Sequence, residues 1–460
     1  MAQDLRSFIE FVADQHPQHL ARATAPVNPN RFEVTALLQR MQQRGEQKMA
    51  LFEHVVDVEE RPSQFPLVFN VFASRPLCAL ALGLPPDQWK MGLSQAFAER
   101  ERRPGHVAQV SAREALCKEV VLKGEDVDLR RLPIPMHHAL DVGPYLTMAC
   151  VMKALSGDFY DVTFTKNLLK GPRRMSLSAH AHHHLDAIVG EHERAGRRAP
   201  CAVILGHHPA LYLASCALSP YGNDDYRTIA GFFDEPLRLV PSETWGEEFL
   251  VPADAEIIIE GEVPPGVRET QNPFGEIAGY YQWEMLMPVL EVTAMTHRRG
   301  GIMQGIFPGH PEHWHLGGIP KEGSVFNSIR RNIPGVTAVH LPMSGCSRFT
   351  CYISLKKEFD NEPRKAAMQA FCDMPNLKFA VVVDEDVDVF NEQDVLWALV
   401  TRTWWDRDLT VVDKVQSFRD WLGGAVAIVD ATRPKDREFP PKNEIPADVL
   451  ARMDPDQYLR

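Results

Sequence analysis

The sequence predicts a mixed α/β protein in which a strand-rich central part is flanked by two parts that alternate helices and strands. Helical apolar spacing marks the beginning of the chain, closely spaced apolar runs fill its middle, and strand–helix–strand alternation returns in its last third. We expect three parts, at residues 1–115, 116–305 and 306–460.

The first part combines helices with a small layer of strands. Residues 4–13 and 33–44 place apolar side chains at helical spacing. Short runs rich in Val, Phe and Leu between about 50 and 83, among them 67–73, predict strands that these helices cover.

The middle part opens with a proline-rich hinge at 132–135 and is dense in apolar runs separated by turn residues. The predicted strands are 149–155, 159–164, 202–205, 255–260 and 289–296. Many strands with little helix between them favour an antiparallel barrel or sandwich. One amphipathic helix at 179–195 is expected to interrupt it.

The last part predicts an α/β module with a mixed sheet. The expected helices are 323–332, 361–372 and 392–402, and the expected strands are 337–341, 350–355 and 379–383. From Pro440 onward the chain is polar and rich in proline, with one short helix. We expect this tail to reach a neighbouring subunit.

Composition excludes several classes of protein. Lysine and arginine total 49 against 61 acids, a net charge of −12, which disfavours nucleic-acid binding. No run of eighteen uncharged apolar residues and no signal-peptide pattern is visible, so we expect no membrane span and a cytoplasmic location. The eight cysteines form no Cys-x-x-Cys pair, which favours reduced thiols over disulfides or a zinc knuckle.

A histidine cluster is the densest group of side chains that could bind a metal. Its members are His180, His182, His183 and His184. On a helix His180 and His184 would share a face, as ligands on adjacent turns do. The alternative is a group of histidines that mostly point to solvent.

The segment 271–281 offers a candidate acid. Pro273 and Gly275 indicate a tight turn that leaves Glu276 among Phe, Ile and Tyr side chains. Apolar surroundings disfavour the charged form, so we expect the pKa of Glu276 to rise until it can donate a proton near neutrality. The alternative is an exposed glutamate on a hairpin.

Two further segments could approach a cation. Residues 214–225 place small residues before turn residues and acids, which suits backbone carbonyls and a carboxylate as ligands, or an ordinary surface loop. The acids of 384–388 follow an apolar strand and either bind a cation or cap the next helix. Neither a phosphate-binding glycine loop nor a familiar hydrolase signature is found.

Taken in order, these segments resemble the UbiD family of reversible decarboxylases over nearly the whole chain. The resemblance rests on residues 132–135, 141–147, 161–166, 214–215, 273–276, 279–280, 383–390 and 394–399. It implies a central split β-barrel that binds prenylated FMN, flanked by α/β parts that include a C-terminal α/β oligomerisation domain.

The resemblance also implies an activity. It is the non-oxidative, reversible decarboxylation of an aromatic, heteroaromatic (for example furan) or conjugated unsaturated acid by a carboxy-lyase. Side chains offer no sink for the electron pair that departing CO2 leaves behind, so a cofactor must supply one. Glu276 matches the residue that delivers the proton, with Lys166 and Gln271 orienting substrate or flavin.

The family further implies a divalent cation, Mn²⁺ or Mg²⁺, at the flavin phosphate and a K⁺ ion beside it. Asp161, His184 and Asp225 match the divalent-cation ligands, with His183 or His180 as alternatives to His184. The potassium loop matches the backbone around Ala214, Ser215 and Ala217. The other residues assigned to cofactor binding are Thr163, Phe164, Thr165, Lys166, His183, Ser215 and Cys216.

Three positions depart from the family pattern. Lys166 stands for an arginine and loses its planar fork, Gln271 stands for a glutamate and cannot exchange a proton, and Val426 stands for a lysine near the phosphate. Two alternatives therefore stay open. One is a catalytically impaired or partner-dependent subunit of a carboxylase complex, and the other is a metal-dependent hydrolase that uses the histidine cluster and zinc without flavin.

Residues 307–318 match the substrate-facing loop of the family. Three histidines and a tryptophan there could stack on an aromatic acid, or form a polar hairpin packed on the barrel. The expected partners are a small aromatic or unsaturated acid, a flavin prenyltransferase that supplies the cofactor, and further copies of the chain, from dimer to hexamer.

Overall fold

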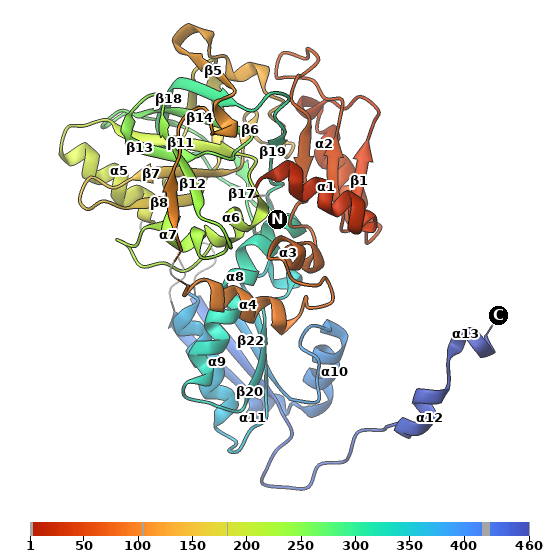
Figure 1. Ribbon diagram of the computed structural model, residues 1–460. Coiled ribbons are helices and arrows are strands. Elements are labelled where there is room, and N and C mark those ends of the chain that lie inside the picture. Colours follow the sequence, from red (N-terminus) through yellow and green to blue (C-terminus); the bar gives the residue numbers. More distant parts are fainter. Residues whose placement is uncertain (1–2, 104, 182, 416–423, 460) are drawn as a thin grey trace.

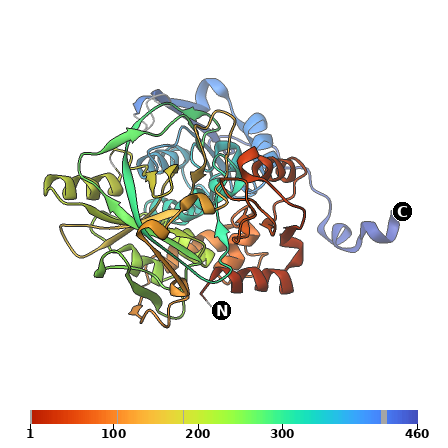
Figure 2. The same ribbon diagram turned by 90° about the horizontal axis from the view of Figure 1, so that it is seen from above.

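The computed structural model describes residues 3–103, 105–181, 183–415 and 424–459. Figure 1 shows the N-terminal and central sheets above, the C-terminal sheet below, and helix α8 (Pro311–Arg330) between them. The end of the chain extends away from this body in both views (Figures 1 and 2). Among the described residues, no helix combines the length and the apolar character that a membrane crossing requires.

The N-terminal part is a four-stranded sheet in the order β1-β2-β3-β19 with two covering helices. These elements are α1 (Leu5–Gln15), α2 (Glu33–Gln43), β1 (Leu20–Ala23), β2 (Met49–Phe52), β3 (Leu67–Phe69) and β19 (Met303–Gln304). Both predicted helices are confirmed. The strand layer is smaller than predicted, because 75–81 form helix α3 (Arg75–Ala81), which Ser74 caps through Leu77 N.

The centre of the molecule is a ten-stranded sheet that curls into a half-barrel (Figures 1 and 2). Its strands are β5 (Val120–Lys123), β6 (Tyr145–Leu146), β7 (Ala149–Lys153), β8 (Tyr160–Phe164), β9 (Asn167–Gly171), β10 (Arg174–Ser176), β11 (Ala199–Leu205), β14 (Ile257–Val263), β15 (Arg268–Thr270) and β18 (Leu286–His297). All pair antiparallel, and each strand predicted here is confirmed with small shifts of its ends.

Two smaller sheets complete the centre. One contains β4 (Val107–Gln109), β12 (Leu237–Ser242) and β13 (Gly246–Pro252), and the other is the hairpin of β16 (Phe274–Gly275) and β17 (Tyr281–Gln282). Helix α7 (Asp225–Ala230) packs against β4, β8 and β12, and helix α5 (His184–Arg194) packs against β7, β8 and β11. Helices α4 (Met91–Arg100) and α6 (Pro209–Ala214) both pack against α8.

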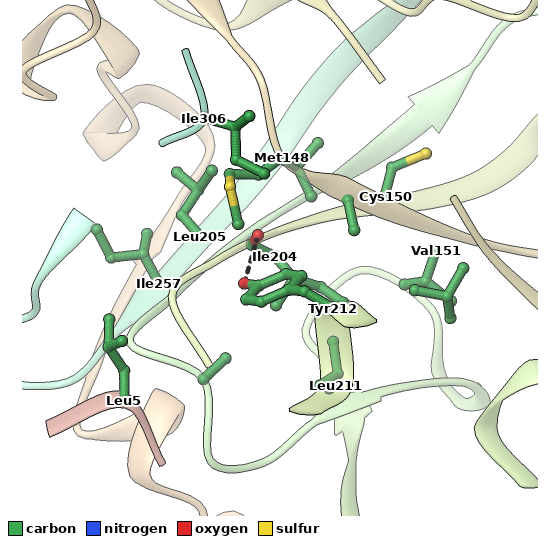
Figure 3. Close-up of a cluster of buried hydrophobic side chains, with 14 of the residues drawn as sticks. Leu5, Met148, Cys150, Val151, Ile204, Leu205, Leu211, Tyr212, Ile257 and Ile306 are labelled. Atoms are coloured by element: carbon green, nitrogen blue, oxygen red, sulfur yellow. Dashed lines mark hydrogen bonds between the residues drawn. The ribbon is translucent and has the colours of Figure 1, made fainter. Parts of the chain in front are cut away.

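A continuous apolar core fixes α6 beneath the central sheet. Tyr212 of α6 is fully buried, and its hydroxyl donates to Ile204 O at 3.0 Å while it accepts from Gly206 N at 2.9 Å. Leu5, Met148 and other buried side chains surround this ring in Figure 3. The core therefore determines where α6 ends and where the segment 214–217 begins.

The C-terminal part is a five-stranded mixed sheet in the order β20-β21-β22-β24-β23. Its elements are β20 (Val336–His340), β21 (Thr350–Leu355), β22 (Phe379–Asp384), β23 (Leu409–Val415), β24 (Gly424–Ala431), α9 (Glu362–Asp373), α10 (Glu392–Arg402) and α11 (Trp405–Asp408). The predicted strand 350–355 and helix 392–402 are confirmed to the residue. The tail contains two short helices, α12 (Ala447–Arg452) and α13 (Pro455–Tyr458), where one was expected.

Two predicted helices have wrong beginnings. The helix expected at 179–195 begins at His184, so His180 and His184 do not share a helical face, and His182 lies outside the described residues. The helix expected at 323–332 is only the end of α8, which begins at Pro311. Gly317, Gly318 and Pro320 lie inside α8 and break the pattern that predicts a helix.

Candidate active site

The turn that carries Glu276 is built from hydrogen bonds to its backbone. Gly275 N donates to Asp141 Oδ1 at 2.9 Å, and Glu276 N donates to Tyr280 O at 2.9 Å. A Cβ on Gly275 would lie 2.3 Å from His138 Nδ1, so this position requires glycine. The turn holds the Glu276 side chain inward, with 2% of its surface exposed.

Glu276 forms an ion pair with Lys166, which follows the last strand residue of β8. Lys166 Nζ lies 2.7 Å from Glu276 Oε1, and Ile277 N donates to Oε2 at 3.2 Å. The prediction of a buried carboxyl group is confirmed, but the prediction of purely apolar surroundings is wrong. The ammonium of Lys166 favours the charged carboxylate, whereas burial disfavours it.

Gln271 belongs to the same network. Its Nε2 donates to Ser178 Oγ at 2.6 Å, and Ser178 Oγ donates to Lys166 O at 2.7 Å. The structure thus brings together all three predicted catalytic residues, Glu276, Lys166 and Gln271. Ser178 lies in an irregular segment before α5, and no sequence motif indicated its role.

Unsatisfied amides line the same region. Gln271 Oε1, Asn272 Nδ2 and both side-chain polar atoms of Asn167 are buried and find no hydrogen-bond partner within the part of the chain that the structure describes. Such groups are uncommon in folded proteins and require an explanation. A flat heteroaromatic cofactor with carbonyl and N–H groups along its edge would satisfy them, so these residues fit a flavin.

The three predicted divalent-cation ligands lie together on β8, α5 and α7. His184 Nδ1 is 3.2 Å from Asp161 Oδ1, and Asp225 Oδ2 accepts from Val162 N at 2.9 Å. Burial and the negative charge of Asp161 raise the pKa of Asp225 to about 7. The hydrogen bond to Asp161 raises the pKa of His184.

The donor types of this group suit a hard divalent cation. Asp161 Oδ2 is buried and has no hydrogen-bond partner among the described residues, and the repulsion between Asp161 and Asp225 would be relieved by a positive charge. Within the described ranges no three His, Cys, Asp or Glu side chains are grouped so that they alone could hold a metal ion. A cation here would therefore also need ligands from a bound phosphate.

The segment 214–217 is the tight C-terminal turn of α6. Ala217 N donates to Ala214 O at 3.0 Å, and the Ser215 hydroxyl donates to Tyr212 O at 2.9 Å. Burial raises the pKa of the Cys216 thiol, although the positive charges of Lys321 and Arg348 act to lower it. The turn lies near Asp225, whose charge also acts on Cys216.

The remaining residues assigned to the cofactor extend from this region. Thr163 and Phe164 end β8, Thr165 N donates to Met148 O at 3.2 Å, and the Phe164 ring is 5.8 Å from that of Tyr212. His183 is exposed and precedes α5 directly.

A row of rings faces the Glu276 turn. The Phe307 ring stacks on His310 at 4.8 Å between centroids and lies 5.2 Å from His138. The prediction of a loop or hairpin over 307–318 is wrong beyond His310, because Pro311 begins α8. The first turn of α8 holds the Glu276 turn, since Trp314 Nε1 donates to Ile277 O at 2.9 Å.

Val426 and the acids of 384–388 have structural roles instead of binding a ligand. Val426 is a buried apolar residue of β24, so no charge occupies the position of the expected lysine. Of the acids at 384–388, Asp384 and Asp386 pair with Arg402 at 2.6 and 2.8 Å. These two carboxylates hold α10 on β22 and need no cation.

Comparison with known proteins agrees with this geometry. The chain matches the N-terminal, Rift-related and C-terminal domains of 3-octaprenyl-4-hydroxybenzoate carboxy-lyase, the UbiD domains, over residues 14–91, 108–311 and 314–419. Anhydromevalonate phosphate decarboxylase of Methanosarcina mazei is 28% identical over 352 residues, which cover 76% of this chain and 79% of that protein.

Solved structures resemble the whole chain. An evolved dimeric form of the UbiD-class enzyme HmfF from Pelotomaculum thermopropionicum, in complex with prFMN, is 34% identical with a TM-score of 0.88 and covers 99% of this chain and 100% of its own. The apo 3,4-dihydroxybenzoic acid decarboxylase of Enterobacter cloacae is 27% identical with a TM-score of 0.86 and covers 99% of both chains.

Proposed function

Because the chain belongs to the UbiD family and is a carboxy-lyase, we propose that it is a prenylated-FMN-dependent decarboxylase that acts reversibly and without oxidation. Its substrate is an aromatic, heteroaromatic or conjugated unsaturated acid. The observation that carries this proposal is the buried Lys166–Glu276 ion pair beside the unsatisfied amides of Asn167, Gln271 and Asn272. Bound prenylated FMN would supply the electron sink that side chains lack.

Lys166 and Glu276 would act as an exchangeable pair. A substrate carboxylate that enters beside Lys166 competes with Glu276 for the ammonium, whose single charge sits on a flexible stem. Glu276 then loses its counter-charge while it stays buried, which favours its protonated form, so the carboxylate would take up a proton from water before CO2 leaves. Once CO2 has left, the Glu276 carboxyl group is placed to deliver its proton to the substrate carbon.

Gln271 would hold the geometry of the pair without exchanging protons. Its Nε2 is fixed by Ser178, which in turn holds the backbone carbonyl of Lys166. Its buried Oε1 would accept a hydrogen bond from the flavin or from the substrate. Gln271 therefore orients the reacting groups, and Glu276 alone transfers the proton.

The substrate class follows from the rings that face the Glu276 turn. The Phe307 ring stacks on the His310 ring at 4.8 Å between centroids and is tilted against the His138 ring at 5.2 Å. Such a wall favours a planar, unsaturated substrate through stacking. This supports an aromatic or heteroaromatic acid over a saturated one.

The divalent cation, Mn²⁺ or Mg²⁺, would be held by Asp161, His184 and Asp225 together with the flavin phosphate. Backbone groups of Ala214, Ser215 and Ala217 would face a K⁺ ion beside it. The supporting observations are the unpartnered Asp161 Oδ2 and the raised pKa of Asp225. The cofactor itself would come from a flavin prenyltransferase.

We also propose that the chain forms a homo-oligomer in the cytoplasm. The tail carries exposed Leu450 and Leu459, and the C-terminal part exposes Val400, Trp404 and Trp405. Apolar surface of this kind marks contacts with another chain. Further copies of the protein are the partners that would cover it.

The family supports the decarboxylase over both alternatives. A metal-dependent hydrolase would need the histidine cluster on one helical face, and α5 begins only at His184. An impaired subunit would need the catalytic groups dispersed, and Glu276, Lys166 and Gln271 instead form one connected network.

The test is to express the full chain together with a flavin prenyltransferase and to purify it without oxygen. We expect a flavin absorbance spectrum, manganese or magnesium by metal analysis, and exchange of labelled bicarbonate into at least one acid of a panel of benzoic, furan and conjugated acids. Protein that carries no flavin, or that carries zinc and hydrolyses esters without a chromophore, would overturn the proposal.

A further inference from the structure

Two cations lie on the side of the 214–217 turn that faces α8. Lys321 belongs to α8, and Arg348 follows the short 3-10 helix η6 (Met343–Gly345). Helix α8 packs against both α6 and η6, and Lys321 Nζ and Arg348 Nη1 both donate to Gly317 O, at 2.9 and 3.4 Å. These two charges and the carboxylate of Asp225 all act on the Cys216 thiol of the turn.

Lys321 has no carboxylate partner among the residues that the structure describes. Its Nζ donates to Gly317 O, a carbonyl of its own helix, at 2.9 Å. Burial and the charge of Arg348 lower the pKa of Lys321 to about 7. A buried ammonium such as that of Lys321 is unfavourable unless an anion lies close to it.

The backbone is shaped to keep Arg348 against α8. A Cβ on Gly317 would lie 2.0 Å from Arg348 Nη2, and a Cβ on Gly318 would lie 2.6 Å from Ser347 Cβ. Glycine is a poor helix former, so both positions cost helix stability. Cys346 and Ser347 also adopt left-handed backbone angles, φ 52° and 50°, which non-glycine residues seldom adopt.

We propose that Lys321 and Arg348 bind the phosphate of the flavin, and so replace the lysine whose position Val426 occupies. This inference rests on the proposed function, because it requires a flavin in the half-barrel. The planar fork of Arg348 and the point charge of Lys321 are the two side-chain types that bind a phosphate dianion most strongly. Asp161, His184 and Asp225 would hold the same phosphate from the opposite side through the divalent cation.

The experiment measures the contribution of the phosphate to binding rather than catalysis. Full-length protein expressed without a prenyltransferase and freed of flavin is titrated with FMN and with riboflavin, which lacks the phosphate, by quenching of flavin fluorescence. A charge-assisted contact contributes about 1.5 to 3 kcal/mol, so Lys321→Met should weaken FMN binding about 10- to 100-fold. Riboflavin binding should change less than about 2-fold, because its ring contacts remain.

Two variants complete the design. Lys321→Arg keeps the positive charge and should restore most of the preference for FMN, and Lys365→Met, on the exposed face of α9, should leave both affinities unchanged. Thermal melting of each variant verifies that the chain is folded.

The outcomes separate the two proposals. If the unmodified protein binds neither flavin, the proposed function fails and the phosphate site fails with it. If the unmodified protein prefers FMN to riboflavin and Lys321→Met keeps the same preference, the assignment of Lys321 is overturned and the proposed function stands.

Discussion

Two buried acid–base pairs in this molecule have the same chemistry but different surroundings. Arg75 contacts Glu322 through both ends of its fork, at 3.0 and 2.9 Å. The same carboxylate accepts from Ser94 Oγ, from Leu341 N at 3.0 Å, and contacts His340 Nδ1 at 2.8 Å. This pair joins α3 and α4 to α8 and β20, and its two residues lie 247 positions apart in the sequence.

The Lys166–Glu276 pair has a single ammonium donor at 2.7 Å, and Lys166 keeps 19% of its side-chain surface exposed. Arginine fixes a carboxylate in two places, whereas lysine can rotate away and return. The two pairs are both buried but differ in the donor to the carboxylate. We propose that a rigid, two-point donor marks the structural Arg75–Glu322 pair, and that a single flexible donor suits the proposed catalytic role of Glu276.

The largest effect should be the loss of turnover when the carboxylate of Glu276 is removed. Glu276→Gln should lower turnover by about 10²- to 10⁴-fold, the usual contribution of a general acid, because the amide cannot deliver the proton. The flavin absorbance of the purified variant should stay unchanged, since Glu276 would not hold the phosphate. Turnover is measured by CO2 release from the best acid of the panel.

The matched control is Glu284→Gln, an exposed carboxylate after β17. It should keep full turnover. Near-normal product formation by Glu276→Gln would show that Glu276 does not deliver the proton.

Breaking the Arg75–Glu322 pair should instead lower the free energy of unfolding. Arg75→Met leaves Glu322 buried without its main counter-charge, and breaking a buried pair in this way costs about 3 to 5 kcal/mol. Urea unfolding followed by tryptophan fluorescence measures the change. The control Arg31→Met breaks an exposed pair with Glu60, where the change in stability should be much smaller because water screens the two charges. If both variants changed the free energy of unfolding equally, the Arg75–Glu322 pair would not have the structural role assigned to it.

The sequence predicted most of the regular fold because apolar periodicity is a local property. The strand 350–355 and the helix 392–402 appear with their predicted bounds. Helix α8 was mostly missed, because Gly317, Gly318 and Pro320 are poor helix formers that tertiary packing accommodates. The predicted start of helix α5 was too early, because the histidines before and in its first turn have surroundings that the sequence does not reveal.

The site was predicted less completely, for a related reason. Glu276 could be found from its local turn, but its pairing with Lys166, 110 positions earlier, depends on how β8 and the hairpin meet. Arg75 and Glu322 are separated by 247 positions, and neither lies in a motif. Contacts of this kind follow from the three-dimensional arrangement, which a single sequence does not specify.

The smallest predicted effect is the pH dependence of the stability that the Arg75–Glu322 pair contributes. Burial opposes ionisation of Glu322, but the charge of Arg75 and the hydrogen bond from His340 prevail and hold the pKa of Glu322 well below its ordinary value of 4.5. A depressed folded-state pKa gives stability that is present above the unfolded-state value and is lost as pH falls below it. The stability difference between the unmodified protein and Glu322→Gln should therefore be constant from pH 6 to 8. Below the unfolded-state value it should shrink by about 1.4 kcal/mol per pH unit, the equivalent of one proton. Urea unfolding at several pH values measures this slope, and a difference that stayed constant or grew in acid would show that Glu322 is not held charged by Arg75.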